Sequence, residues 1–453
     1  MRRIPFVNTV LIAGALVSGS VLAYALWFRH EYYGGWQSVV LFYAVPGVAC
    51  ASCLGALSLP YPLRQNIALA LVSAAVGLYG IELALNALGY LEHTARLEAA
   101  NQLGLKVDTR TKLEVLDDLR KKGLDAYPAI RNPRSLWGAV RVNGKEIVPL
   151  GGISGVTTVL CKESGYWATY LADEHGFNNP AGLWSLPAWD IAAVGDSFAH
   201  GNCVNPADTI TGIMRLKYPK TANLGIGANG PLIELATIKE YLPAKRPRAV
   251  LWLYYEGNDL HDLVKERRSE ILMRYLTGNF SQSLAGQQSE IDRALRAFVD
   301  RAVEQERGLT WRYSRPMKIA TLSAIRVSLG LASGQVDTDV DIDLGLFEEV
   351  LVEAKRFVNS WGGEVVFVYL PGVARFSGQP LNKYARQRDA VLRTVSSHNI
   401  PVVDVQALFE SQDDPLGLFT SRARFRSYYS DWHYSEKGYR LVAEAVMKRL
   451  ENR

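Results

Sequence analysis

Long stretches without charge in the first 91 residues constrain this chain more than any other feature. No Asp, Glu, Lys or Arg occurs at positions 4 to 28 or 32 to 63, and Glu82 alone interrupts positions 65 to 91. A helix needs roughly 20 apolar residues to span a bilayer. A cleaved signal peptide would account only for the first stretch. The sequence therefore predicts a membrane module at residues 1–92, with transmembrane helices at residues 8–28, 38–59 and 66–88.

Charged residues beside the predicted spans indicate their orientation. Arg2 and Arg3 precede the first span and Arg64 lies between the second and third, whereas Arg29 in the first loop is balanced by Glu31. Short cytoplasmic segments are the ones enriched in Lys and Arg. We therefore expect an integral protein of a bacterial inner membrane, with membrane lipid as a partner. Its amino terminus would be cytoplasmic, and everything after about residue 92 periplasmic or otherwise extracytoplasmic.

Polar residues within the predicted spans admit a functional and a structural interpretation. Glu82 and Asn86 can line a substrate path, but a place at the membrane interface or against a neighbouring helix is favoured. Cys50 and Cys53 have the spacing of a redox motif without the flanking strand and helix, so we interpret them as packing residues.

The remaining composition excludes some classes of function. The net charge of +5 is spread along the chain without a polybasic block, which gives no case for nucleic-acid binding. Four cysteines are too few for a disulfide scaffold. Cys161 and Cys203 both fall on the oxidising side of the membrane and can form a disulfide, which would tie the segment before the predicted sheet to the loop after Ser197.

The part beyond the membrane module divides into two predicted regions. Residues 93–188 predict a stalk, or a helix lying over the domain, at about 97–122, followed by a small β-rich subdomain or lid with short alternating runs. Residues 189–453 alternate apolar runs with helical stretches, which predicts a doubly wound α/β domain with a mostly parallel sheet. Residues 263–331 are too many for a simple connection and predict a helical insertion. The five predicted strands lie at residues 191–194, 222–224, 249–254, 365–369 and 401–405.

Two motifs imitate ligand sites and are not favoured. Residues 225–230 match the spacing of a dinucleotide-binding glycine loop, and Glu256 imitates its acidic residue. However, the loop follows the second strand of the domain, and Pro231 cuts short the phosphate-binding helix start. Residues 337–348 resemble a calcium loop, but Ile342 stands where the sharp turn needs glycine. We expect an acidic loop that caps the next helix, and neither a cofactor nor a metal.

A third pattern joins residues that are far apart in the sequence. Ser197 follows the first predicted strand, Asn258 follows the third, and Asp431 and His433 share one loop near the end of the chain. A serine nucleophile needs a base to take its proton and a carboxylate to orient that base. Backbone N–H groups at Ser197 and in the turn of Gly227 and Ala228, with the Asn258 amide, can stabilise an oxyanion.

These blocks resemble, in order and spacing, those of the SGNH (GDSL-type) hydrolase superfamily. The resemblance rests on residues 195–197, 223–230, 257–259 and 431–433, and covers residues 189–453 apart from the insertion. It implies a flavodoxin-like three-layer α/β/α fold with Ser197 as nucleophile, His433 as base and Asp431 as its orienter. The oxyanion donors would be Ser197, Gly227 or Ala228, and Asn258, with Asp196 and Gly257 in support.

The sequence departs from the family pattern at two points. Ala228 stands where the second block has glycine, and one residue separates Asp431 from His433 where many members have two. Ala199 also excludes the nucleophile elbow of the unrelated α/β-hydrolase fold.

The function that the resemblance implies is an extracytoplasmic serine esterase or O-acyltransferase anchored in the membrane. Members attached to membrane modules often act on acyl groups of cell-surface or exported glycans, so we expect a polysaccharide O-acetyl substrate. Other membrane proteins of polysaccharide assembly are candidate partners. A non-catalytic glycan-binding or assembly protein and a lipid-directed esterase remain alternatives.

Overall fold

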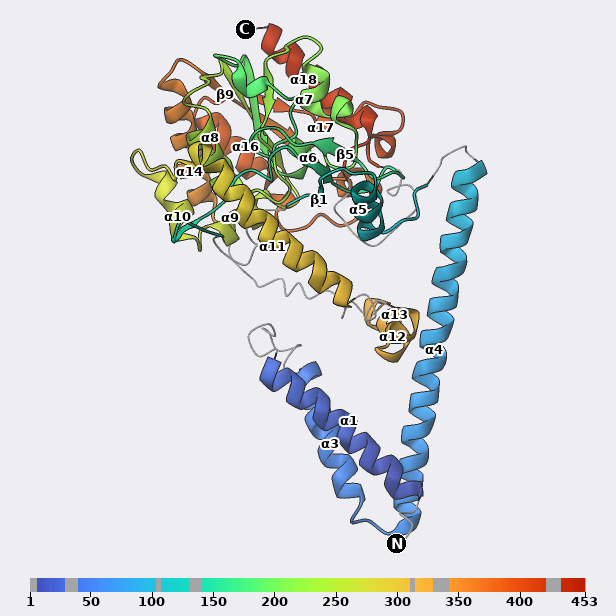
Figure 1. Cartoon of the computed structure of the whole chain (residues 1–453). Helices are drawn as coiled ribbons and strands as arrows, with labels where there is room; N and C mark the ends of the chain where they lie inside the picture. The colour runs from blue at the N-terminus through green and yellow to red at the C-terminus, as the bar shows by residue number, and fades with distance from the viewer. Residues whose placement is uncertain are drawn as a thin grey trace. The chain divides into compact units, whose positions relative to one another are not determined.

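The computed structural model describes residues 6–28, 40–102, 107–130, 140–309, 314–328, 342–420 and 433–452 (Figure 1). The chain forms two compact units. The first comprises residues 1–99 and 308–340, and the second comprises residues 100–307 and 341–453.

Apolar helices dominate the first unit. Among the described residues, two helices are long and apolar enough to cross a membrane: Phe6–Trp27 within α1 (Phe6–Phe28), and Tyr61–Tyr90 within α4 (Tyr61–Gln102). The second predicted span is shorter than expected. It consists of a π-helical turn (Val40–Ala44) and α3 (Val45–Ala56), and the chain turns at residues 57–60 before Pro60 leads into α4. Three full spans are therefore not evident in the part of the chain that the structure describes.

Small residues allow α1 and α3 to approach each other closely. A Cβ added at Gly14 would lie 3.0 Å from the Cys53 sulfur, and one added at Gly19 would lie 3.5 Å from the Cys50 sulfur. Both cysteines are free thiols. Cys50 and Cys53 are thus packing residues in a small-residue helix contact, as the sequence predicts.

Glu82 of α4 binds the backbone of a short helical segment from the same unit. This segment comprises α12 (Arg315–Ala320) and α13 (Ser323–Ser328). The Glu82 carboxylate is buried and accepts from the N–H groups of Ala324 and Ile325, each at 2.9 Å, and from the Asn86 amide at 2.8 Å. Glu82 therefore packs against a neighbouring helix, which is the favoured interpretation.

A five-stranded parallel sheet forms the centre of the second unit. Its order is β10-β9-β8-β6-β7, and every neighbouring pair is parallel. Counted along the chain, this order is 2-1-3-4-5, that of flavodoxin-like doubly wound folds. The predicted α/β fold with a parallel sheet is thus confirmed. The strands are β6 (Ile191–Gly195), β7 (Thr221–Asn223), β8 (Ala249–Tyr255), β9 (Glu364–Leu370) and β10 (Val402–Asp404).

Helices cover both faces of this sheet because its strands are apolar on both sides. Trp252 and Phe367 face one core, which α8 (Pro231–Tyr241), α14 (Leu344–Asn359) and α16 (Arg388–Ser397) complete. Leu253 and Val368 face the other, which α7 (Ile210–Met214), α17 (Gln406–Glu410) and α18 (Glu436–Glu451) complete. The two cores make three layers. The long interval after β8 begins with α9 (Asp259–Glu266), α10 (Glu270–Met273) and α11 (Gln288–Leu309), and α15 (Ala374–Ser377) follows β9.

Short strands precede the main sheet. After α5 (Lys112–Lys121), strands β1 (Ala126–Pro128), β4 (Thr157–Val159) and β5 (Thr169–Leu171) form a separate sheet of order β1-β4-β5. Strands β2 (Val140–Val142) and β3 (Lys145–Ile147) form a hairpin. β4 and β5 are antiparallel, and the loop that joins them contains Cys161 and Glu163.

Candidate active site

A tight turn after β6 places Ser197 at the carboxyl edge of the sheet. Gly195 has a φ of 151°, and a Cβ there would lie 2.7 Å from the side chain of Ala199 and from the carbonyl oxygen of Leu253, so the turn needs glycine. The Asp196 carboxylate accepts from the Phe198 N–H at 2.8 Å and caps α6 (Ser197–His200). Neighbours β7 and β8 lie on opposite sides of β6, so Ser197 is at the topological switch point, where ligands collect in such folds.

His433 contacts the Ser197 hydroxyl. Its Nε2 lies 2.9 Å from Oγ of Ser197. A β-bridge between Phe419 and Tyr434 holds the segment, and the Thr420 N–H donates to the His433 carbonyl at 2.9 Å. A base thus lies within hydrogen-bond reach of a serine hydroxyl, which is the arrangement that activates a serine nucleophile.

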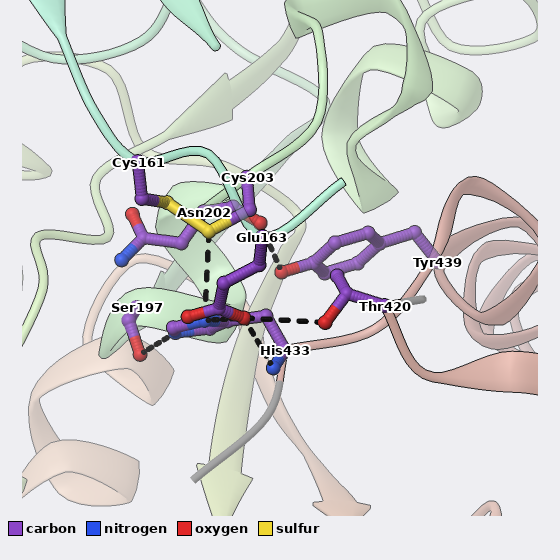
Figure 2. The surroundings of a disulfide bond; sticks show 8 residues. All are labelled: Cys161, Glu163, Ser197, Asn202, Cys203, Thr420, His433 and Tyr439. Atoms are coloured by element: carbon purple, nitrogen blue, oxygen red, sulfur yellow. Dashed lines mark hydrogen bonds and ion pairs between the residues drawn. A yellow bond between two sulfur atoms is a disulfide. The ribbon is translucent and has the colours of Figure 1, made fainter. Parts of the chain in front are cut away.

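Glu163 occupies the other side of the His433 ring (Figure 2). Its Oε2 lies 3.0 Å from Nδ1 of His433 and accepts from the His433 backbone N–H at 3.1 Å and from the Thr420 hydroxyl at 3.3 Å. Burial raises the pKa of Glu163, but the charge and hydrogen bonds of His433 outweigh burial and leave the pKa below its ordinary value. Glu163 is therefore a carboxylate at neutral pH.

Glu163 belongs to none of the four sequence blocks, and Asp431, the orienter that those blocks imply, lies outside the described residues. The role of Asp431 stays a prediction. A usable signal for Glu163 is nevertheless present, because a Cys161–Cys203 pairing, which the sequence leaves open, would bring position 163 to the loop after Ser197. All four blocks lie after residue 189, so they point to no carboxylate ahead of the nucleophile.

Cys161 and Cys203, whose pairing the sequence leaves open, form a disulfide. The Cys203 sulfur also lies 3.8 Å from Nδ1 of His433 (Figure 2). Glu163, Cys203 and His433 together resemble a metal-ligand cluster in spacing. A sulfur engaged in a disulfide is not the thiolate that binds a metal, so this cluster does not fit a metal site.

The turn after β7 faces the nucleophile. A Cβ added at Gly227 would lie 3.8 Å from Cβ of Ser197 and 3.7 Å from Nδ2 of Asn202, so Gly227 borders the space beside Ser197. Ala228 has a φ of 67°, in the left-handed region that favours glycine. The chain thus adopts a glycine-type turn at the position where its sequence departs from the family pattern.

Asn258 joins the site through Asp196. Its Nδ2 donates to Asp262 at 3.2 Å, its side chain also hydrogen-bonds the Asp196 carboxylate, and its buried Oδ1 has no partner among the residues that the structure describes. Burial raises the pKa of Asp196, and these contacts oppose that rise. At Gly257, a Cβ would lie 2.4 Å from the Tyr255 ring, so only glycine fits there. The structure thus brings Asn258 to the turn that contains Ser197.

Other contacts bear on the two ligand-site motifs. Glu256 is buried and binds Arg375 and the Gly372 N–H, so it does not face a ribose site. Glu266 accepts from the Gly230 N–H at 2.6 Å and the Leu232 N–H at 3.0 Å, which occupies the helix start that would hold a phosphate. In the calcium-like loop, Asp343 caps α14 by accepting from Leu346, whereas residues 337–341 lie outside the described residues.

No family model matches this chain, and no curated protein matches it. Several solved structures are similar to part of it. The lipase/acylhydrolase from Enterococcus faecalis is 12% identical, with 58% of this chain and 96% of that chain covered and a TM-score of 0.33. A member of the lipolytic protein G-D-S-L family from Veillonella parvula is 15% identical, with 59% and 100% covered and a TM-score of 0.30. An acetyl xylan esterase is 10% identical, with 57% and 99% covered and a TM-score of 0.33.

Proposed function

We propose that this protein is a membrane-anchored serine esterase or O-acyltransferase that acts on acetyl groups of a cell-surface or exported polysaccharide. One observation carries the proposal. The Ser197 hydroxyl lies 2.9 Å from Nε2 of His433 at the carboxyl edge of a parallel sheet. A binding protein that had lost its chemistry would have no need to keep this contact.

The first half of the reaction follows from these positions. Oγ of Ser197 attacks the carbonyl carbon of an ester while Nε2 of His433 takes the hydroxyl proton. Negative charge then develops on the former carbonyl oxygen. The N–H groups of Ser197 and of Gly227 or Ala228 are the donors assigned to that oxyanion. Asn258 is the third assigned donor, and its amide must release Asp262 to reach the oxyanion.

The second half decides between hydrolysis and transfer. The tetrahedral intermediate collapses when the protonated His433 gives its proton to the departing sugar oxygen, which leaves an acyl group on Ser197. His433 then removes a proton from the next nucleophile. Water as that nucleophile makes the protein an esterase, and a sugar hydroxyl makes it an acyltransferase.

Two features support a location at a membrane and outside the cytoplasm. Helices α1 and α4 contain apolar segments long enough to cross a bilayer. The Cys161–Cys203 disulfide is typical of an oxidising compartment. Glycan acetyl groups are the proposed substrate because exported polysaccharides are available on that side of the membrane.

The test uses the full chain purified in detergent. We expect an organophosphonate to label the wild type, and the wild type to cleave a chromogenic acetyl ester. Ser197→Ala and His433→Ala should lose at least about 10³-fold in turnover. Ser397→Ala and His398→Ala change matched residues away from the site and should retain turnover. Turnover in Ser197→Ala equal to that of the wild type would refute the proposal. Assays on acetylated glycan, with and without an acceptor sugar, then distinguish hydrolysis from acyl transfer.

A further inference from the structure

We propose that Glu163 is the carboxylate that orients His433 toward Ser197, and that the Cys161–Cys203 disulfide holds Glu163 in that position. The inference rests on the serine chemistry proposed above. It adds a positioning residue from outside the four sequence blocks, and it makes activity depend on an intact disulfide.

The contacts of Glu163 fix the tautomer of the base. Its Oε2 lies 3.0 Å from Nδ1 of His433. A carboxylate only accepts hydrogen bonds, so Nδ1 carries the proton and Nε2 keeps a lone pair for the hydroxyl of Ser197. The same oxygen accepts from the His433 backbone N–H at 3.1 Å, so ring and backbone are anchored at one point.

Glu163 lies where its negative charge can stabilise the imidazolium that His433 becomes during the reaction. Its side chain is 21% exposed and that of His433 is 13% exposed, so water screens the pair weakly. The Thr420 hydroxyl donates to the same Oε2 at 3.3 Å. When His433 takes the proton of Ser197, the new positive charge therefore forms beside a fixed negative charge.

Glu163 belongs to a part of the fold that the main sheet does not hold directly. It lies in the loop between β4 and β5, in the separate three-stranded sheet. Backbone hydrogen bonds within the loop, such as Ala168 N–H to Cys161 at 2.9 Å and Gly165 N–H to Lys162 at 3.0 Å, are local. Two contacts reach further: the Asp108 N–H donates to the Gly165 carbonyl at 2.7 Å, and the Tyr166 hydroxyl donates to Glu436 of α18 at 3.0 Å. These noncovalent contacts leave room for a stronger constraint on the position of the loop relative to His433.

The disulfide supplies a covalent constraint of the right kind. Cys161 lies two residues before Glu163, and Cys203 lies in the loop that follows α6 and Ser197. The Cys203 sulfur is 3.8 Å from Nδ1 of His433, so the bridge reaches the catalytic imidazole itself (Figure 2). The bridge joins the loop that contains Glu163 to the segment that contains the nucleophile.

Reduction should therefore release Glu163. A dithiol such as dithiothreitol transfers two electrons to the S–S bond, and each cysteine sulfur takes up one proton. The reagent becomes a cyclic disulfide. The loop is then held by noncovalent contacts, among them its local hydrogen bonds, the contacts of Glu163 and the Tyr166–Glu436 hydrogen bond, so the fraction of molecules with an oriented His433 falls.

The first experiment compares the two candidate carboxylates in the full chain. Organophosphonate labelling rates and the kcat/KM of a chromogenic acetyl ester are measured from about pH 5 to about pH 9. Glu163→Gln should lower both by at least about 10²-fold. The acid limb of its pH profile should move about one unit lower, because the imidazolium loses its anionic neighbour. Asp431→Asn should lower both rates much less than Glu163→Gln does and should leave the pH profile unmoved. Thr420→Ala removes one hydrogen bond to Glu163 and should cost less than about tenfold.

Three outcomes separate the explanations. The assignment is overturned if Glu163→Gln keeps wild-type rates and a wild-type pH profile. It is also overturned if the loss expected of Glu163→Gln appears in Asp431→Asn and not in Glu163→Gln. Labelling that persists in Ser197→Ala means that the serine chemistry itself is wrong. If Glu163→Gln fails to fold, Glu163→Asp is the variant that tests the assignment. Its carboxylate is one methylene shorter, so kcat should fall while KM stays unchanged. An unchanged kcat in that variant also overturns the assignment.

The second experiment tests the disulfide. Dithiothreitol should slow labelling of the wild type by at least about tenfold, and reoxidation should restore it. The pair Cys50→Ser and Cys53→Ser removes the other two cysteines of the chain and should respond like the wild type. The pair Cys161→Ser and Cys203→Ser should be slow from the start and indifferent to the reductant. Full-rate labelling of a wild type with alkylated Cys161 and Cys203 would refute the role of the bridge.

Discussion

Oε2 of Glu163 contacts both the Nδ1 and the backbone nitrogen of His433, a residue 270 positions later in the chain. A single oxygen thereby fixes the direction of the imidazole plane and the segment that holds it. Ser197 lies on the opposite ring nitrogen. The side chains of Glu163, His433 and Ser197 are thus joined by consecutive hydrogen bonds. Glu163 comes from a loop of the separate three-stranded sheet, and Ser197 comes from the edge of the main sheet.

Gly227→Ala should lower kcat/KM by about 10²-fold without unfolding the protein. The added methyl group would lie 3.8 Å from Cβ of Ser197, an ordinary contact that the fold tolerates, but it would fill space that the ester carbonyl and its oxyanion need. Gly345→Ala, in α14, is the matched control and should retain turnover. Wild-type kinetics in Gly227→Ala would remove this turn from the oxyanion hole.

Ala228→Gly should stabilise the protein by about 1 kcal/mol, because glycine adopts a φ of 67° without the steric cost that alanine bears. The measurement is the midpoint of thermal unfolding in detergent. Ala236→Gly, in the middle of α8, is the control of opposite sign and should lose at least about 1 kcal/mol. A lower midpoint for Ala228→Gly would show that the turn carries no such strain.

Stability should fall as the pH drops below about 6.5, in part because of His200. Burial, with the nearby His433 as a smaller cause, lowers the pKa of His200 from 6.5 to about 3. Below pH 6.5 the unfolded histidine binds a proton and the folded one does not, so the unfolded state gains. Between about pH 6.5 and pH 5 the loss from this group is about 2 kcal/mol.

The pH dependence of the unfolding midpoint checks this expectation. His200→Gln should have a shallower acid-side slope than the wild type. Tyr170→Phe removes the hydroxyl that hydrogen-bonds Nε2 of His200 and leaves the titrating group in place, so it should keep the wild-type slope. Identical slopes in His200→Gln and the wild type would contradict the prediction.

Glu82→Ala should loosen the segment that contains α12 and α13. The N–H groups of Ala324 and Ile325 lose their acceptor, at a cost of about 1–3 kcal/mol each. Hydrogen exchange of peptides from residues 314–328 should accelerate by about tenfold or more. Glu82→Gln keeps one acceptor oxygen and should show a smaller change. Exchange rates that match the wild type in Glu82→Ala would mean that the segment is held by other contacts.

Much of the second unit could be predicted from its sequence because its strands are short apolar runs with turn residues between them. The runs near Ile191 and Ala249 correspond to β6 and β8, and the order of runs along the chain is that of a doubly wound sheet. Ser197 could be placed at a strand end because Gly195 and Asp196 are turn residues that end the apolar run.

What could not be predicted depends on contacts between distant segments. Glu163 follows a three-residue strand in a segment rich in glycine, and nothing local distinguishes it from a surface glutamate. The length of the second predicted span depends on where its helix ends, and the apolar composition of the sequence does not reveal that end. Its last turn ends before Pro60, so α3 extends only over Val45–Ala56.

The division of the chain into units has a practical consequence for anyone who wants the second unit in soluble form. The chain passes between the two units at three places, after residues 99, 307 and 340. Deletion of the first 99 residues would remove Glu82 and leave α12 and α13 attached to the second unit without their acceptor. A secretable version therefore requires two excisions, the leading helices and residues 308–340, with a new linker between α11 and α14.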